Sequence, residues 1–312
     1  MSNYRIGDVI RLTRLCMGIT QEQLCENICS VQTLHRIENG KTSVKKELYI
    51  KLMKKMERIP ERSYAVCVGK DIELIEELEM YEMALQQGDY QKADHYLKRI
   101  KKKADGNLIT NQFVLKGEAI TDYYCNRSDG ETTIRKLEKV IQLTLPNYKE
   151  YLDKKFPFTE QEIFCLISLA NANAYIDRDE EAIKIYENLL DCLGMDYIAG
   201  DNIRHIRLVA MRNLAVIYCG CKMYEKAFKL NSECLKYAEE NNEGLKMIEL
   251  LSDKALIILR QISRGEREST DIDLAKQCLR QAYYLAVAKN NMSVASILKK
   301  AYRKELNEEM VY

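Results

Sequence analysis

The chain has little of what interrupts helices. Its 312 residues include only 3 prolines and 13 glycines, against 48 Lys+Arg and 47 Asp+Glu. Proline and glycine end or weaken helices, whereas long charged side chains favour helix surfaces. With 46% hydrophobic residues the chain can also bury a sizeable core. The composition therefore predicts an all-α protein with about two domains.

Long apolar runs are missing as well. No stretch approaches the roughly 20 apolar residues that a membrane-spanning helix needs, and the first residues, MSNYRIGDVI, lack the apolar core of a signal peptide. We therefore expect a cytoplasmic protein that does not contact a membrane. In the cytoplasm the 11 cysteines should be reduced thiols, and their scattered positions indicate no disulfide framework.

The residue patterns of common catalytic and cofactor sites are also absent from the sequence. Cys25 and Cys29 lie one helical turn apart, and Cys219 and Cys221 form a CGC segment, but neither pair has the partner histidines of a zinc site. There is no glycine-rich phosphate loop and no nucleophile elbow. We expect neither an enzyme nor a bound cofactor or metal, and we interpret these cysteines as small core residues.

Charge is divided unevenly along the chain. Residues 1–58 carry 11 Lys+Arg and 6 Asp+Glu, a net charge of +5, whereas the remaining residues carry 37 and 41, a net charge of −4. A small basic module joined to a larger, mildly acidic one is the layout expected when only the first part contacts nucleic acid.

The basic module contains the segment GITQEQLCENICSVQTLHRIENGK, residues 18–41. Thr20 and Gln23 form a capping box that starts a helix over QEQLCENI, and Ser30 is a suitable N-cap for a second helix over VQTLHRIEN. The glycines at the two ends of the segment suit left-handed positions next to helix ends. A turn of only one or two residues between the two helices predicts a helix-turn-helix.

The second of these helices has two different faces. At 100° per residue, Leu34 and Ile37 fall on one side, and a polar set falls on the other: Gln32, His35 and Arg36. Glutamine pairs well with adenine, and arginine with guanine, in the major groove of DNA. A merely solvated face is the alternative interpretation.

The ends of the segment, TQEQL and RIENGK, resemble the helix-turn-helix of the Cro and lambda-repressor (XRE) family. The resemblance implies that Gln32 and Arg36 read bases, with additional contacts from Val31, Thr33 and His35. It implies phosphate contacts for Gln21, Asn39 and Lys41. It also implies a structural salt bridge between Arg14 and Glu38.

The chain after Arg58 is repetitive. The segment IPERSYAVCVGK predicts a linker over residues 59–70. Helix pairs then recur with a small residue at the same place, namely Ala93, Ala182, Ala227 and Ala275, with Ile134 in a fainter unit. The steps of 41 to 48 residues exceed the roughly 34 of a standard tetratricopeptide repeat. We predict five degenerate tetratricopeptide repeats and a C-terminal capping helix within residues 71–312.

An XRE-type module followed by long, irregular repeats resembles the RRNPP family (Rgg- and PlcR-like regulators) of Gram-positive bacteria. The resemblance implies a right-handed superhelix of repeats that forms a homodimer and holds a short linear signalling peptide in its concave face. The implied function is quorum sensing: a cytosolic transcriptional regulator that binds operator DNA and is controlled by a peptide pheromone.

A groove for an extended peptide needs amide side chains for the peptide backbone and cations for its carboxylate. In tetratricopeptide units the first helix of each pair lines the groove. Counting back from the alanines gives the candidates Lys116, Tyr123, Asn171, Arg212 and Arg260, and Asn126 and Asn213 lie nearby. For each residue alone a solvated or helix-pairing position is an equally good interpretation, but three basic residues recur on the expected side.

Two other functions remain open at this point. The cysteines allow a redox- or metal-responsive DNA-binding regulator, which requires DNA affinity to change on oxidation. The repeats allow a scaffold that binds a protein partner, which requires a protein helix in the groove.

Overall fold

The computed structural model describes residues 6–56, 72–103, 108–154, 156–194, 203–241, 243–244 and 246–310. Within these ranges the chain is helical and has no β-strand, which confirms the predicted all-α class. The chain divides into two compact units, Met1–Ala199 and Gly200–Tyr312, and this division falls within the repeats. The predicted linker, residues 59–70, lies outside the described residues, so a domain boundary after residue 58 stays a prediction.

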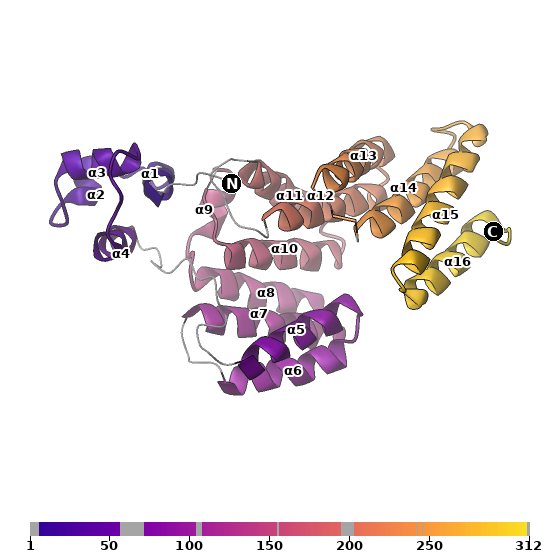
Figure 1. Cartoon of the computed structure of the whole chain (residues 1–312), viewed down its shortest axis with the longest axis horizontal. Helices are drawn as coiled ribbons and strands as arrows, with labels where there is room; N and C mark the ends of the chain where they lie inside the picture. Colours follow the sequence, from indigo (N-terminus) through magenta and orange to yellow (C-terminus); the bar gives the residue numbers. More distant parts are fainter. Residues whose placement is uncertain are drawn as a thin grey trace. The chain divides into compact units, whose positions relative to one another are not determined.

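Four helices form the N-terminal module (Figure 1). They are α1 (Ile6–Cys16), α2 (Gln21–Cys25), α3 (Val31–Glu38) and α4 (Lys46–Lys55). The capping box starts α2, because the Thr20 hydroxyl accepts from the N–H of Gln23 and the Gln23 side chain accepts from the N–H of Thr20. Ser30 caps α3 by accepting from the N–H of Thr33. One core joins the four helices, with Ile10, Leu24, Leu34 and Leu52 among its fully buried residues.

The turn between α2 and α3 is longer than the one or two residues that the sequence predicted. Helix α2 ends at Cys25 instead of continuing to Ile28. Asn27 takes a left-handed backbone conformation with φ of 61°, which asparagine tolerates better than most residues and which is incompatible with continuing a helix. The N–H groups of Ile28 and Cys29 then both donate to the carbonyl of Cys25. A local backbone preference thus overrides the apolar spacing that suggested a longer helix.

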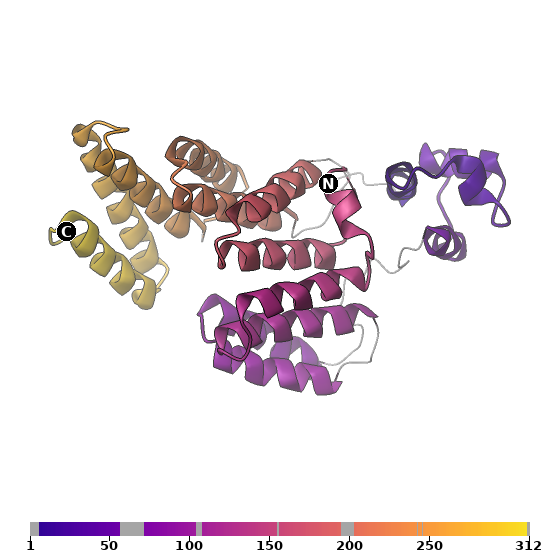
Figure 2. The ribbon, with the colours of Figure 1, turned by 180° about the vertical axis from the view of Figure 1, so that it is seen from behind.

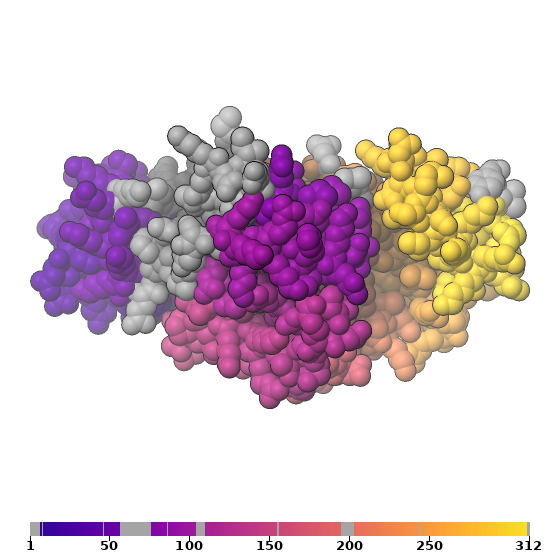
Figure 3. Space-filling view, turned by 90° about the horizontal axis from the view of Figure 1, so that it is seen from below, coloured from indigo at the N-terminus to yellow at the C-terminus, as the bar shows by residue number. Residues whose placement is uncertain are grey.

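Ten of the remaining helices in the described part of the chain form five pairs in sequence order (Figures 1 and 2). In the first unit they are α5 (Ile72–Gln86) with α6 (Tyr90–Lys103), α7 (Leu108–Tyr124) with α8 (Gly130–Gln142), and α10 (Glu160–Ala174) with α11 (Asp179–Leu193). In the second unit they are α12 (Ile203–Gly220) with α13 (Tyr224–Glu240), and α14 (Lys246–Ser263) with α15 (Ile272–Ala288), followed by α16 (Met292–Leu306). Side chains of the first two pairs lie in direct contact (Figure 3). Five repeats and a capping helix are as the sequence predicted.

The repeated small residue lies in the second helix of each pair. Ala93, Ala182, Ala227 and Ala275 are completely buried, and Ile134 is 5% exposed. A small side chain here lets paired helices approach closely. Each turn within a pair contains one residue with positive φ: Gly88, Asn126, Asp177, Lys222 and Gly265. Asn126, a candidate named as lying near the inward positions, therefore lies in the turn after α7.

Part of the extra length of the repeats lies between α8 and α10. A short helix, α9 (Tyr148–Leu152), occupies this connection between Pro146 and Pro157. Phe156 and Phe158 after it are buried and stack in a tilted arrangement with ring centroids 5.2 Å apart. The insertion thus has a small aromatic core of its own.

The capping helix α16 covers the last repeat. Its Ala295, Leu298 and Tyr302 are buried in the same core as Ala275 and Leu279 of α15. Among the described residues, no helix has the length and apolar character needed to cross a membrane.

Candidate DNA-binding and ligand-binding sites

The core of the N-terminal module fixes the orientation of α3. Leu34 is fully buried and Ile37 is 2% exposed, so the opposite face of the helix points to solvent. A Cβ on Gly7 would lie 1.9 Å from the carbonyl oxygen of Ile37, so only glycine lets α1 approach the end of α3 this closely. As predicted, Gln32, His35 and Arg36 lie on the exposed face.

The side chains of Gln32 and Arg36 form no hydrogen bond or ion pair with other described residues. Their side chains are exposed and start from adjacent turns of α3. The amide group of Gln32 and the guanidinium of Arg36 therefore keep their donors for an external partner. This pair has the geometry that base reading in a major groove requires, because both groups can form two hydrogen bonds in one plane.

The other candidate DNA-contacting side chains around α3 differ in burial and in the hydrogen bonds that they form within the module. The side-chain amide of Asn39 turns back and donates to the carbonyl of His35 at 2.8 Å, and its Nδ2 lies 3.1 Å from His35 Nε2. Val31 and Thr33 are half-buried, and the Thr33 hydroxyl lies 2.8 Å from that of Ser30. Lys41 is exposed beyond the end of the helix.

A buried polar network holds α1, α2 and α3 together. Arg14 Nε donates to Glu38 Oε1 at 2.7 Å and a terminal nitrogen of Arg14 donates to Glu38 Oε2 at 2.8 Å, so the expected salt bridge is formed with two hydrogen bonds. Gln21 Nε2 donates to Glu38 Oε2 at 2.6 Å. The Gln21 amide, which the resemblance assigned to a DNA phosphate, is thus engaged inside the module.

In the repeats of the first unit, Lys116 on α7 is the most unusual candidate. It is only 9% exposed, and no carboxylate of the described residues lies within ion-pair distance of its ammonium. The ammonium instead lies 5.3 Å from the ring centroid of Phe113 and 4.9 Å from that of Phe164 on α10. Burial lowers the pKa of Lys116, and the charges of Cys165, Glu82 and Glu160 act in the opposite direction. A buried cation without a carboxylate at ion-pair distance is costly in the free protein, and contact with aromatic rings offsets only part of that cost.

Two further candidates of this unit are oriented by aromatic partners. Tyr186 on α11 donates its hydroxyl to Asn171 Oδ1 at 2.6 Å, so the amino group of the Asn171 amide points away from that contact. Tyr123 stacks on Tyr175 with ring centroids 5.8 Å apart, and Tyr175 is 53% exposed. Phe164 and Tyr186 were not among the predicted site residues. Each lies on a different helix from the side chain that it contacts, and no local spacing in the sequence links the two positions.

In the second unit, Arg212 is already neutralised. It lies 2.6 Å from Glu249 and 2.6 Å from Asp253, both on α14. We expected Arg212 to be an exposed cation in the groove, and this was wrong, because two carboxylates of the next repeat hold it. Arg260 is exposed and lies 3.7 Å from Glu305, and Asn213 is half-buried.

Comparison with known proteins gives a partial match by sequence and an extensive one by structure. The helix-turn-helix family model matches residues 10–61. No curated protein matches the chain by sequence. The structure of PlcR from Bacillus thuringiensis with the peptide PapR7 and DNA is similar over 95% of this chain and 99% of that one, with 20% identity and a TM-score of 0.60.

Two streptococcal proteins are similar over the same length. ComR from S. thermophilus, in complex with DNA and its signalling peptide ComS, covers 96% of this chain and 99% of that one, with 12% identity and a TM-score of 0.57. The pheromone receptor Rgg2 of Streptococcus dysgalactiae covers 96% and 100%, with 13% identity and a TM-score of 0.50. The chain thus has a helix-turn-helix domain at residues 10–61 and, over nearly its whole length, the fold of the PlcR, ComR and Rgg2 regulators.

Proposed function

We propose that this chain is a cytosolic transcriptional regulator of the quorum-sensing type. It binds operator DNA as a homodimer through α3 and is controlled by a short linear peptide held by its repeats. The observation that carries the proposal is the combination of a helix-turn-helix match with a whole-chain fold shared by PlcR and ComR, whose structures contain DNA and a peptide.

The DNA-binding part rests on the exposed face of α3. Gln32 and Arg36 offer free donors at the spacing of one helical turn, and Lys41 adds a phosphate contact beyond the helix end. One module of this size covers one half-site of a two-fold operator. Two modules in a fixed relation are needed for the whole operator, and for this reason we propose a homodimer.

The peptide-binding part rests on Lys116 and Asn171, which lie on first helices of the second and third repeats. An ammonium that is buried without a carboxylate partner gains most from a ligand that brings one, such as the C-terminus of a peptide. The Tyr186 hydroxyl donates to the oxygen of the Asn171 amide and so fixes the orientation of this amide on the third repeat. Arg212 is withdrawn from this proposal, because Glu249 and Asp253 already satisfy its charge.

Control of DNA binding requires the peptide to favour one arrangement of the two DNA modules over another. Linkage of this kind is typically about 1 to 3 kcal/mol, or roughly a 5- to 150-fold change in operator affinity. The same coupling must appear in reverse, as a change in peptide affinity when operator DNA is bound.

The redox-responsive alternative finds little support in the thiols. No disulfide joins any two of the described cysteines. Burial raises the pKa of Cys29 and Cys219 above the ordinary value, and that of Cys165 and Cys234 to about 12. The thiolate is the form that reacts with oxidants, so these side chains are poorly suited to sensing. A protein-binding scaffold would leave DNA affinity unaffected by any peptide.

The proposal is tested by calorimetry and by DNA binding with the same reagents. Synthetic peptides that cover the C-terminal segments of short open reading frames beside the gene are titrated into the full chain. We expect one of them to bind with a stoichiometry of one per chain, and to lose affinity when its C-terminus is amidated. Binding of none of these peptides, or equal binding of the amidated form, would count against the peptide site at Lys116.

A further inference from the structure

The second helix of the first repeat carries a row of basic residues that neither the fold nor the proposed peptide site uses. Lys92, His95, Arg99 and Lys102 on α6 are spaced by three, four and three residues, so they lie on one face of the helix. All four are exposed, whereas Ala93, Leu97 and Ile100 on the other side are buried. The row spans about 15 Å along the helix axis.

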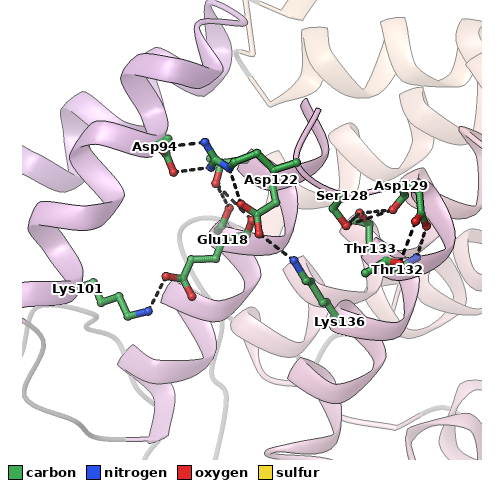
Figure 4. Close-up of polar contacts among 12 residues, drawn as sticks. Asp94, Lys101, Glu118, Asp122, Ser128, Asp129, Thr132, Thr133 and Lys136 are labelled. Carbon is green, nitrogen blue, oxygen red and sulfur yellow. Dashed lines mark hydrogen bonds and ion pairs between the residues drawn. The ribbon is translucent and has the colours of Figure 1, made fainter. Parts of the chain in front are cut away.

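Other cations near this helix are already paired, which sets the row apart. Figure 4 shows the seam between α6, α7 and α8, where Lys101 lies 2.6 Å from Glu118 and Lys136 lies 2.8 Å from Asp122. Arg127 joins Asp94 to the same seam at 2.7 Å. These pairs fasten the first repeat to the second and leave little net charge in the seam.

Within the exposed row, by contrast, only Arg99 has a carboxylate partner, Glu77 at 2.8 Å. Lys92 and Lys102 form no ion pair with any other residue that the structure describes. Lys92 and Lys102, at the two ends of the row, are thus the cations of this face without a carboxylate partner among the described residues. The free ones retain their full charge for an external anion.

The surrounding sequence makes this surface a basic region in an acidic domain. Residues 90–142 carry 11 Lys+Arg and 7 Asp+Glu, a net charge of +4, although residues 59–312 as a whole carry a net charge of −4. The rest of the repeat region therefore has a net charge of −8. The excess of positive charge lies in α6 (Tyr90–Lys103), which carries 6 Lys+Arg and 1 Asp+Glu, whereas α5 of the same repeat carries only acidic charges.

We propose that this row on α6 contacts the phosphate backbone of DNA beside the operator. The inference rests on the proposed DNA-binding function. A polyanion of regular charge fits a row of lysine and arginine without a central aromatic or aliphatic anchor, whereas protein interfaces usually have such anchors. The first repeat belongs to the same compact unit as the DNA-binding module. The chain between α4 and α5, residues 56–71, can span up to about 50 Å, which leaves flanking DNA within reach.

The test compares two DNA lengths. The operator is selected by the full chain from a pool of random duplexes, and is then prepared as a core of about 20 base pairs and as a duplex extended by about one helical turn on each side. The double variant Lys92→Gln and Lys102→Gln is compared with wild type by fluorescence anisotropy over a range of salt concentrations. The control variant, Lys229→Gln with Lys300→Gln, removes the same charge from exposed lysines elsewhere in the repeats.

We expect the double variant to bind the short core like wild type and to bind the long duplex at least about fivefold more weakly. The slope of the logarithm of the binding constant against the logarithm of the salt concentration (the salt slope) should fall on the long duplex by about 1 for each phosphate that the variant no longer neutralises. The control variant should match wild type. Equal binding of the long duplex by the double variant and wild type would overturn the proposal and leave the operator contact of α3 intact. If wild type selects no operator at all, that result contradicts the proposed DNA-binding function and, with it, this inference.

Discussion

The DNA-binding module and the repeats of the first unit differ in where they place charged side chains that have no ion-pair partner. In the DNA-binding module the buried charges of Arg14 and Glu38 neutralise each other, and Arg36 projects into solvent without a partner. In the repeats Lys116 is buried without a carboxylate partner among the described residues. The comparison teaches that an exposed free charge such as that of Arg36 costs the fold little, whereas a buried one such as that of Lys116 opposes folding. In the proposed function, a peptide carboxylate offsets the cost at Lys116.

The largest effect should follow from breaking the buried pair of the DNA-binding module. Replacing Arg14 with methionine leaves Glu38 buried without its partner, and loss of one member of such a pair typically costs about 3 to 5 kcal/mol in the free energy of unfolding. The measurement is urea unfolding of the full chain. Arg178 is the matched control, because its ion pair with Glu131 is exposed and Arg178→Met should cost about 1 kcal/mol or less. Equal losses for the two variants would contradict the structural role of the Arg14 pair.

Lys116→Met should stabilise the fold and weaken peptide binding. Removing a buried ammonium that lacks a carboxylate partner should raise the free energy of unfolding by about 1 to 3 kcal/mol, because its desolvation is no longer required. The same variant should bind the peptide at least about 100-fold more weakly by calorimetry. Lys149→Met, at an exposed lysine that lies over the ring of Tyr148, should change neither quantity appreciably. A destabilised Lys116→Met variant would show that the lysine supports the fold instead.

Two substitutions near α3 should separate base reading from backbone contact. Arg36→Ala should weaken binding to the selected operator by about 1 to 3 kcal/mol and leave binding to unrelated DNA nearly unchanged. Lys41→Ala should weaken binding to both by a similar factor and reduce the salt slope by about 1. If the two variants lose operator and unrelated DNA in the same proportion, α3 does not read bases through Arg36.

The smallest effect concerns pH and the seam between the first two repeats. Burial alone would raise the pKa of Asp94, but hydrogen bonds from Lys98 and Arg127 hold it below its ordinary value. Burial also opposes ionisation of Asp122, and Lys136 and Arg127 likewise lower its pKa. A carboxylate with a lowered pKa stabilises the fold above its unfolded-state pKa, near 4, and this stability is lost as pH falls through the folded-state value.

Arg127→Met should therefore lower stability at neutral pH and make it less sensitive to acid between about pH 5 and 2. Thermal unfolding at a series of pH values measures both. Arg135→Met on α8, whose guanidinium donates only to the hydroxyl of Thr132, provides the control. An unchanged pH profile in Arg127→Met would exclude the seam as a source of acid sensitivity.

The sequence predicted the features that depend on local spacing. The capping box at Thr20, the exposed face of α3 and the repeated alanines follow from positions within one or two helical turns, and the structure confirms each of them. The predicted end of helix α2 was wrong. The left-handed conformation of Asn27 stops the helix, although the apolar spacing favours a longer one, and a single sequence does not show which of the two prevails.

The environment of the candidate ligand-binding residues could not be predicted in the same way. Lys116 and Arg212 are both basic residues on the first helix of a pair. Lys116 nevertheless lies over the ring of Phe164, whereas Arg212 forms an ion pair with Asp253. These neighbours come from the next repeat, 41 to 48 residues further along. In degenerate repeats that distance varies, so the sequence does not fix which side chains meet across a pair of first helices.

The central claim is that a peptide bound at the repeats changes operator affinity, and one measurement tests it directly. Operator binding of the full chain is followed by fluorescence anisotropy with and without a saturating concentration of the peptide identified by calorimetry, in wild type and in Lys116→Met. The account predicts a change of roughly 5- to 150-fold in wild type and none in the variant, with peptide-free operator affinity the same in both. An unchanged operator affinity in wild type with the peptide bound would contradict it.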